Sequence, residues 1–334
     1  MMEMSITIKC IELNLNIKRN IEELETFFLR FDLQLEKLDR MYIAVYGNNE
    51  WLGCGGRHKN ILKCFAVNEN RRNEALLDIL VTELIKDSYK QGFEDLFIYT
   101  KSNYVDLFRN FGFNLVADTN AVCLLHRGPR DIQNVLDDIR VDIKPDTLVG
   151  AVVLNANPFT YGHRHLIESA SSRVDRLLIF VVENDAPRFP FKDRFMLVKE
   201  QTKDLENVSV LPSTEFIISN ATFPSYFLKE NKLVDSEHAK LDSMIFKKYF
   251  VLHFNIKKRF LGEEPIDQST SIYNETLLSV LPPECEVIVI ERKKLGDQYI
   301  SASTVRREFD KGNFELIKDL VPEGTYRYLK ENYR

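Results

Sequence analysis

Paired cysteines are missing from this sequence. Its 334 residues include five cysteines, and none of them stands in a C-x-x-C pair: Cys10, Cys54, Cys64, Cys123 and Cys285. That spacing gives no sign of a disulfide framework or of a zinc knuckle. We therefore expect the five side chains to be small, mostly buried groups in a protein of a reducing compartment.

Long apolar runs and an excess of basic charge are also missing. No run approaches the ~18 apolar residues that a membrane-spanning helix needs. The N-terminus has no basic stretch followed by an apolar one, as a signal peptide would. The net charge is −5 with both signs interspersed, whereas nucleic-acid binders usually carry a basic excess. These absences predict a soluble cytoplasmic protein that binds neither membranes nor nucleic acid.

A mixed pattern of helices and strands fills the first part of the chain, residues 1–128. Apolar spacing predicts a helix over 19–38 and a stronger one over 74–89, where leucines form a single stripe. A further short helix is expected over 105–110. Strands are expected at 41–45, 51–54, 61–67, 96–99 and 121–125. This order indicates an α+β domain.

The pattern changes after Gly128 and Pro129. Residues 129–146 are interpreted as a linker that contains a helix over 131–140. From 147 to 334, apolar runs such as Leu177 to Val182 alternate with helical segments, which is typical of parallel strands covered on both faces. Strands are expected at 148–154, 177–182, 208–211, 256–261 and 287–290. The second domain is therefore predicted to be α/β, with a Rossmann-like parallel sheet.

A phosphate-binding motif is expected directly after the first of these strands. Residues 160–163 read Thr-Tyr-Gly-His, at a turn from strand to helix. Unpaired N–H groups at a helix start attract anions, and Thr160 and His163 could hydrogen-bond the phosphates of a nucleotide. Four more residues are assigned to the same nucleotide site, of which the last is equally compatible with a structural role: Asn157, Phe159, Gly162 and His165.

A second phosphate cradle is expected behind the strand at 287–290. Residues 300–306 read Ile-Ser-Ala-Ser-Thr-Val-Arg. Hydroxyl groups at a helix start, with one guanidinium a turn later, suit the end of a triphosphate. The assigned residues are Ser301, Ser303, Thr304 and Arg306. Because open α/β sheets bind ligands at the carboxyl ends of their strands, both motifs predict one nucleotide site.

Charged residues after other strands are further candidates. Lys192 and Arg194 follow the second strand of the sheet, where they could neutralise a triphosphate, and Glu263 follows the strand at 256–261. A solvated basic turn and a simple acidic turn fit the same residues. Two basic runs, 257–259 and 292–294, are interpreted as solvated faces, of which the second could instead dock an acidic carrier protein.

The two motifs together resemble the nucleotidyltransferase superfamily, which includes the adenylyltransferases. Residues 1–128 resemble the GNAT acyltransferase fold, because Leu107–Phe113 matches its late segment with an aromatic before G-F. The acyl-CoA loop of that family, Q/R-x-x-G-x-G/A, should stand at Asn70–Ala75, where asparagines replace the first residue and the first glycine. The domain is thus either a working acetyltransferase or a docking module that keeps the shape.

The chain as a whole, most strongly from residue 150 onward, resembles the citrate lyase ligases. Besides 150–163 and 299–306, the resemblance rests on 185–194, 215–227 and 261–265, which are not general features of the superfamily. It implies an enzyme that activates acetate with ATP and acetylates the thiol of a dephospho-CoA-derived group on the citrate lyase acyl carrier protein, releasing AMP and pyrophosphate. Mg²⁺ is expected as counter-charge, held mainly by phosphates and water. The expected catalytic residues are His163, Thr160, Lys192 and Arg194.

Two other functions are compatible with the phosphate motifs. One is a nucleotidyltransferase acting on a phosphorylated coenzyme precursor, like a phosphopantetheine adenylyltransferase. That function would not explain the GNAT-like half or the segment Ser219–Pro224. The other is a non-catalytic protein that binds nucleotide or carrier. The complete set of hydroxyl, imidazole and guanidinium groups in the two motifs argues against this second alternative.

Overall fold

The chain forms two compact units in a computed structural model. The structure describes residues 8–47, 50–68, 74–183, 188–217, 223, 226–228, 231–265 and 267–332. Outside them lie 70–73 of the expected acyl-CoA loop, 185–187 and 218–222. Contacts group Met1–Asp131 with Phe223–Glu237 in the first unit, and Ile132–Thr222 with His238–Arg334 in the second.

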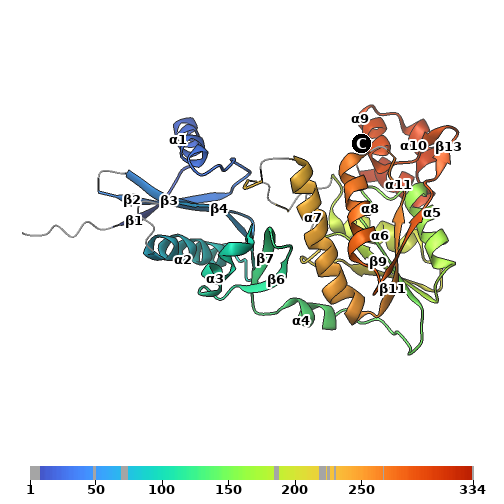
Figure 1. The fold of residues 1–334 in the computed structure, drawn as a ribbon. Helices are drawn as coiled ribbons and strands as arrows, with labels where there is room; N and C mark the ends of the chain where they lie inside the picture. The colour runs from blue at the N-terminus through green and yellow to red at the C-terminus, as the bar shows by residue number, and fades with distance from the viewer. Residues whose placement is uncertain are drawn as a thin grey trace, which may run out of the picture. The chain divides into compact units, whose positions relative to one another are not determined.

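A seven-stranded sheet forms the first unit, in the order β1-β2-β3-β4-β5-β7-β6 (Figure 1). Its pairs are antiparallel except for β4 with β5. Helices α1 and α2 cover opposite faces of this sheet. The strands are β1 Lys9–Glu12, β2 Arg40–Tyr46, β3 Glu50–His58, β4 Ile61–Val67, β5 Leu96–Lys101, β6 Asn114–Asp118 and β7 Val122–Arg127. The helices are α1 Lys18–Leu29, α2 Glu74–Lys90, the 3₁₀ turn η2 Ser102–Tyr104 and α3 Val105–Arg109. The predicted α+β class is confirmed.

The first helix ends earlier than its apolar spacing predicted. Helix α1 stops at Leu29, and Asp32 then takes a left-handed backbone conformation with φ of 59°. The N–H of Leu33 donates to the carbonyl of Phe28 at 3.1 Å, which closes the end of the helix. The apolar residues beyond this point therefore continue the pattern without continuing the helix.

A segment from late in the sequence, Phe223–Glu237, belongs to the first unit. The ring of Phe223 meets Tyr99 of β5 edge-on at 5.7 Å, and the Tyr226 hydroxyl donates to the carbonyl of Tyr99 at 3.4 Å. The N–H of Gln34 donates to the carbonyl of Tyr226 at 3.0 Å. The prediction of one continuous second domain over 147–334 did not include this return of residues 223–237 to the first unit. The return arises because these aromatic side chains are buried against β5.

The second unit is built on a five-stranded sheet that is parallel throughout, in the order β10-β9-β8-β11-β12. The strands are β8 Val149–Leu154, β9 Arg176–Val181, β10 Val208–Pro212, β11 Ile256–Gly262 and β12 Glu286–Ile290. All five match the predicted segments closely: four are short, largely apolar runs between polar turns, and β11 carries the basic run 257–259 between apolar residues. A small ladder, β13 Lys294–Leu295 with β14 Gln298–Tyr299, follows β12.

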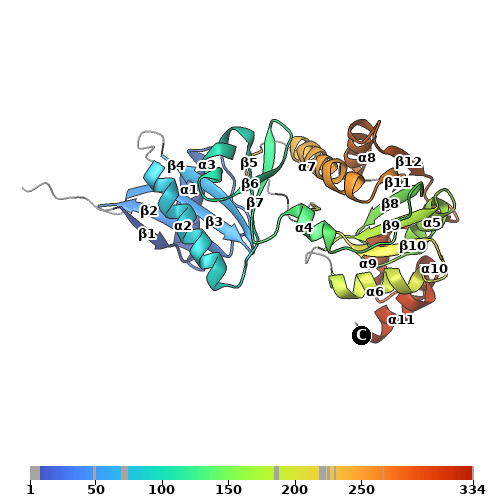
Figure 2. The same ribbon diagram turned by 90° about the horizontal axis from the view of Figure 1, so that it is seen from below.

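Helices cover both faces of this sheet (Figure 2). The helices along this part of the chain are α4 Ile132–Asp137, α5 Tyr161–Ser171, α6 Phe191–Gln201, α7 Asn231–Ile245, the π-helix η3 Phe246–Val251, α8 Gln268–Val280, α9 Ala302–Asp310, α10 Phe314–Leu320 and α11 Glu323–Asn332. The expected linker helix corresponds to α4, which is shorter than predicted. None of the helices described is long and apolar enough to cross a membrane.

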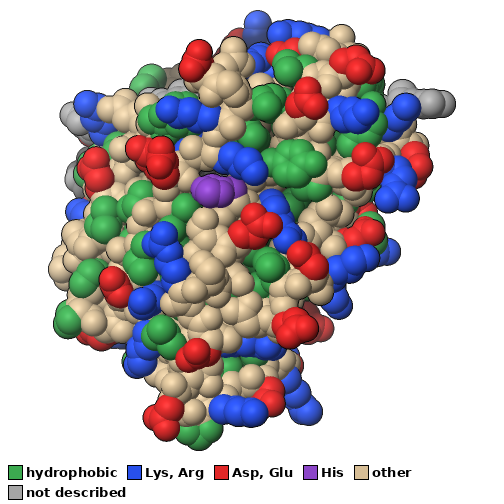
Figure 3. Space-filling view, turned by 90° about the vertical axis from the view of Figure 1, so that its right-hand side faces the viewer, with side chains coloured by type: hydrophobic (Ala, Val, Ile, Leu, Met, Phe, Trp, Pro, Cys, Tyr) green, Lys and Arg blue, Asp and Glu red, His purple; other side chains and the backbone are tan. Residues whose placement is uncertain are grey.

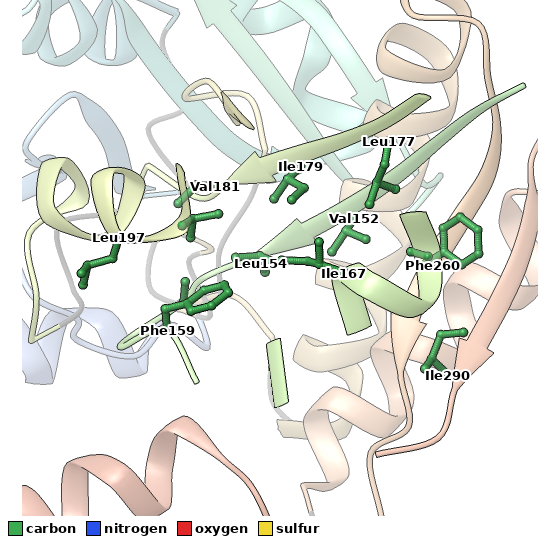
Figure 4. Close-up of a cluster of buried hydrophobic side chains, with 13 residues drawn as sticks. Val152, Leu154, Phe159, Ile167, Leu177, Ile179, Val181, Leu197, Phe260 and Ile290 are labelled. Atoms are coloured by element: carbon green, nitrogen blue, oxygen red, sulfur yellow. The ribbon is translucent and has the colours of Figure 1, made fainter. Parts of the chain in front are cut away.

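The core beneath the site lies between the sheet and helices α5 and α6 (Figure 4). Val152 and Leu154 of β8 and Ile179 of β9 meet Ile167 of α5 and Leu197 of α6. Burying an apolar side chain of this size contributes about 1.5–3 kcal/mol. This packing fixes the direction in which α5 leaves β8, and so places the turn between them.

The opposite face of the sheet buries an arginine that the sequence analysis placed in a solvated run. Arg259 of β11 is 1% exposed, and its guanidinium lies 4.8 Å from the ring centre of Phe246. Burial lowers the pKa of Arg259. The interpretation of 257–259 as a solvated face is therefore wrong for this residue. Successive side chains of a strand alternate between faces, so a basic run in a strand need not lie on one surface.

Candidate functional site

The carboxyl ends of three neighbouring strands, β8, β11 and β12, set the position of the site. Helix α5 begins after β8, and α9 begins after β12 and the β13–β14 ladder. Parallel strands present the start of each following helix at the same edge of the sheet. The two predicted phosphate motifs therefore belong to one edge.

Thr160 and His163 form a capping box at the start of α5. The hydroxyl oxygen of Thr160 accepts from the backbone N–H of His163 at 3.3 Å, and Nδ1 of His163 accepts from the backbone N–H of Thr160 at 3.0 Å. The two side chains thus satisfy two N–H groups that a helix start leaves unpaired. Thr160 is 1% exposed, and its side chain holds this turn.

His163 is held as a neutral imidazole with a defined tautomer. Because Nδ1 accepts a hydrogen bond, the ring carries its proton on Nε2, which is then a donor. Burial, the charge of Arg292 and the charge of Arg306 lower the pKa of His163 from 6.5 to about 4. The ring stacks on buried Phe159 with centres 5.7 Å apart. Phe159 therefore supports the imidazole from the core.

Gly162 brings the two predicted motifs into contact. A Cβ at this position would lie 3.1 Å from the carbonyl oxygen of Ile300, the residue that begins the second motif. The glycine thus allows the first turn of α5 to approach the entrance to α9 closely. This contact explains why a glycine stands between the hydroxyl and the imidazole.

Ser301 caps helix α9. Its hydroxyl accepts from the backbone N–H of Thr304 at 3.0 Å and lies 2.8 Å from the Thr304 hydroxyl and 2.9 Å from the Ser303 hydroxyl. Ser303 is exposed, while Ser301 and Thr304 are half-buried. Three hydroxyl groups thus gather at the start of a helix, where the helix dipole favours an anion.

Arg306 ties this helix to the turn after β8. Its Nη1 donates to the carbonyl of Asn157 at 2.5 Å, and burial lowers the pKa of the guanidinium. The Asn157 side chain accepts from the N–H of Phe189 at 3.3 Å. Asn157 therefore links the segment before α5 to the segment before α6, through Phe189, and to helix α9, through Arg306. The structure brings the two motifs together as the sequence indicated.

Arg292 is a charged residue of this site that the sequence analysis missed. It follows Ile290, the last residue of β12, and its charge acts on His163. Its Nη1 lies 2.6 Å from Oε1 of Glu264, which follows Gly262 at the end of β11. The run Arg-Lys-Lys looks like a solvated face. The available signal was its place after β12, the strand that precedes the second phosphate motif.

Other predicted site residues are placed differently. Arg194 is 0% exposed, and its guanidinium donates to the carbonyl of Phe189 at 3.0 Å and to the carbonyl and side-chain oxygen of Asn155 at 2.6 and 2.9 Å. It holds the loops that follow β8 and β9 from within the protein. Lys192, in the first turn of α6, and Glu263 are exposed, and His165 is half-buried in α5.

The surface around these elements carries charges of both signs. Figure 3 shows one face of the molecule, on which a histidine side chain lies among basic side chains with acidic ones close by. Basic and acidic side chains are mixed on this face, and no broad basic field is visible. Such an arrangement suits a small phosphate-bearing ligand.

Comparison with known proteins shows to which family the chain is similar. Residues 149–329 match the family of the citrate lyase ligase C-terminal domain. The chain is 35% identical to the [citrate [pro-3S]-lyase] ligase of Escherichia coli (strain K12) over 319 residues, which are 93% of this chain and 91% of that protein. It is 34% identical to the ligase of the same name from Haemophilus influenzae over 325 residues, 94% and 96% of the two chains.

Similarity to solved structures is weaker. Thermotoga maritima TmcAL, bound with alpha-thio ATP, covers 55% of this chain and 55% of its own at 13% identity, with a TM-score of 0.38. The relatives of known name, by contrast, match both units along nearly their whole length. The chain belongs to the citrate lyase ligase family.

Proposed function

We propose that this protein is an AMP-forming acid–thiol ligase of the cytoplasm that acetylates the citrate lyase acyl carrier protein. Acetate and ATP would give acetyl adenylate and pyrophosphate. The thiol of the dephospho-CoA-type prosthetic group would then take the acetyl group and release AMP. The proposal extends to this chain the activity that its relatives' names describe.

The observation that carries the proposal is the junction of the two phosphate motifs. Gly162 lies against Ile300, and Arg306 reaches the carbonyl of Asn157. The start of α5 and the entrance to α9 are thereby joined by one close backbone approach and by one hydrogen bond from an arginine side chain to a backbone carbonyl. A site of this kind positions phosphates and neutralises charge, which is most of what attack at an α-phosphate requires of a protein.

The first step needs charge stabilisation on the leaving group. An acetate oxygen forms a bond to the α-phosphorus, and the bond from that phosphorus to the bridging oxygen breaks as pyrophosphate leaves with its electrons. Nε2–H of His163 would donate to a phosphate oxygen as this charge develops. Ser301, Ser303 and Arg306 would bind the β- and γ-phosphates. Lys192 stands exposed at the start of α6, where a long side chain could reach the triphosphate.

The second step is acyl transfer to sulfur. The thiolate of the prosthetic group attacks the carbonyl carbon of acetyl adenylate, and AMP leaves as the carbon–oxygen bond to its phosphate breaks. The thiol proton passes to solvent or to a base. The GNAT-like unit is our candidate for docking the carrier or its arm, since every phosphate-binding residue named above lies in the second unit.

Mg²⁺ would act as counter-charge for the triphosphate. Within the part of the chain that the structure describes, no group of three or more His, Cys, Asp or Glu side chains could hold a metal by itself. We therefore propose that phosphate oxygens and water supply most of its ligands, as Mg²⁺ commonly prefers. Bound there, it would withdraw charge from the leaving pyrophosphate.

Pyrophosphate release from ATP, measured with a panel of short carboxylic acids, tests the first step. We expect release that depends on acetate and accelerates when the reduced carrier protein is added. A dinucleotide product from ATP and phosphopantetheine would instead favour the coenzyme-precursor alternative. ATP binding without any pyrophosphate release or exchange would favour a non-catalytic binding protein.

A further inference from the structure

Arg292 and Glu264 form an ion pair at the edge of the sheet where the phosphate motifs meet. The pair joins the loops after the adjacent strands β11 and β12, and these loops are also tied by the N–H of Glu263, which donates to the carbonyl of Ile290 at 2.8 Å. The two paired side chains are 18% and 13% exposed. The pair is thus partly shielded but open to solvent on one side.

The pair lies within electrostatic reach of the imidazole that we assign to phosphate binding. The charges of Arg292 and Arg306 both act on His163, although Arg292 follows β12 and Arg306 lies in helix α9. Glu264 matches the charge of Arg292, and the guanidinium of Arg306 is directed to the carbonyl of Asn157. A triphosphate arriving here carries more negative charge than Glu264 does.

We propose that Arg292 is a phosphate-binding residue held in reserve by Glu264, and that the triphosphate of ATP displaces the Glu264 carboxylate from it. The inference rests on the proposed function and adds an element to its site. Glu264 then lowers the affinity of the empty site for anions and keeps the arginine in position. Once released from Glu264, Arg292 neutralises the negative charge that develops on the leaving pyrophosphate.

The geometry of the contact favours displacement of Glu264 by a phosphate over a permanent ion pair that only ties the two loops together. The contact runs through one nitrogen of Arg292, Nη1, and a guanidinium can offer a phosphate two parallel donors, which a point contact to a carboxylate does not use. A second feature is the charge around His163: removing Glu264 would leave the charge of Arg292, which acts on this ring together with that of Arg306, without its counter-charge. Such an arrangement binds anions more tightly.

The two roles predict opposite effects of one substitution. If the pair only ties two loops together, Glu264→Gln should weaken ATP binding and lower the melting temperature. If Glu264 competes with phosphate, Glu264→Gln should tighten ATP binding by about twofold to fivefold, the worth of a partly exposed ion pair. Arg292→Gln should weaken it by about tenfold to a hundredfold, as loss of a charge-assisted hydrogen bond does.

The experiment is calorimetric titration of the full-length protein with ATP and, separately, with inorganic pyrophosphate. Variants are Glu264→Gln, Arg292→Gln and the double variant, with Glu275→Gln on α8 and Lys257→Gln on β11 as exposed charge controls. We expect tighter binding by Glu264→Gln, and a double variant that behaves like Arg292→Gln. Weaker binding by Glu264→Gln, or unchanged binding by Arg292→Gln, overturns the proposal.

A second readout does not depend on nucleotide. Because Arg292 lowers the pKa of His163, Arg292→Gln should raise the pKa that NMR reports for that ring, while Lys257→Gln should leave it unchanged.

A wild-type protein that binds pyrophosphate but not ATP would contradict the proposed function. The titrations with pyrophosphate would then still decide whether an anion displaces Glu264 from Arg292. A wild-type protein that binds neither anion overturns both proposals.

Discussion

The backbone N–H of Thr160 donates to Nδ1 of His163 over 3.0 Å, and the Thr160 hydroxyl lies 3.0 Å from the same nitrogen. This relationship gives the histidine two tasks at once. Nδ1 completes the helix cap, and Nε2–H is left as a donor of fixed direction. Preorganised donors of this kind stabilise charge that develops in a transition state.

Replacement of His163 by alanine should abolish most adenylate formation. Loss of one preorganised donor typically costs ~10²–10³ in rate. Loss of a cap costs about 1 kcal/mol of stability, so the variant should still fold. The measurement is acetate-dependent exchange between ATP and pyrophosphate, with thermal unfolding as the folding control. Near-normal exchange by a folded variant would remove His163 from the mechanism.

The lowered pKa of His163 should make stability fall with acid in a defined window. The unfolded chain takes up a proton at the ordinary value near 6.5, whereas the folded chain takes it up only near pKa 4. Stability from this group is therefore complete above pH 6.5 and is lost as pH falls toward 4. In His163→Gln, the unfolding free energy should depend less on pH between those values. Identical pH profiles for the two proteins would contradict the assignment.

Gly162→Ala should weaken ATP binding without unfolding the protein. Alanine is intrinsically better than glycine in a helix by roughly 0.5–1 kcal/mol. Here its Cβ would lie 3.1 Å from the Ile300 carbonyl, so the α9 entrance must shift by a few tenths of an ångström. We expect ATP affinity to fall by about tenfold, since small misplacements are costly in such sites. Ser172→Ala, just beyond the other end of α5, is the control.

Arg194→Met should act on stability more than on the chemical step. The buried guanidinium serves three oxygen atoms of Phe189 and Asn155, and those acceptors would lose their donor. Hydrogen bonds to charged groups contribute about 1.5–3 kcal/mol each, so the melting temperature should drop clearly. Lys199→Met, exposed in the same helix, is the control. Unchanged stability together with a large loss of rate would return Arg194 to the catalytic set.

A fragment that begins near Lys144 should retain the phosphate site but aggregate. The buried rings of Phe223, Tyr226 and Phe227 belong to the first unit and would be exposed without it. The same fragment with all three replaced by serine should run as a single species in size-exclusion chromatography and keep acetate-dependent exchange. A monodisperse unsubstituted fragment would show that these rings do not need the first unit.

The sequence was most informative where local pattern and tertiary structure agree. The central strands β8 and β9 were predictable because each is an apolar run that is buried along nearly its whole length, and the two motifs because each stands at a helix start. β1 and β6 were missed because they are short strands with exposed residues and little apolar alternation. Their existence depends on pairing with neighbours that are distant in sequence.

Charged residues were harder to place, because the same side chain can serve either surface or interior. Arg194 and Arg259 looked like candidates for solvent or ligand, yet both are buried. Arg292 looked solvated, yet its partner Glu264 comes from the preceding strand's end. The position of a charged residue directly after a strand indicated correctly that it lies at the carboxyl edge of the sheet. It did not give the side-chain direction, which depends on packing from both faces.

The most direct test of the central claim is the mass of the citrate lyase acyl carrier protein after incubation with this protein. The reaction contains reduced carrier with its prosthetic group, ATP, Mg²⁺ and isotope-labelled acetate. The account predicts that the prosthetic thiol gains one labelled acetyl group, with one AMP and one pyrophosphate per carrier, and that His163→Ala does not catalyse this. A carrier that stays unmodified while the wild-type protein is folded and binds ATP would contradict the account.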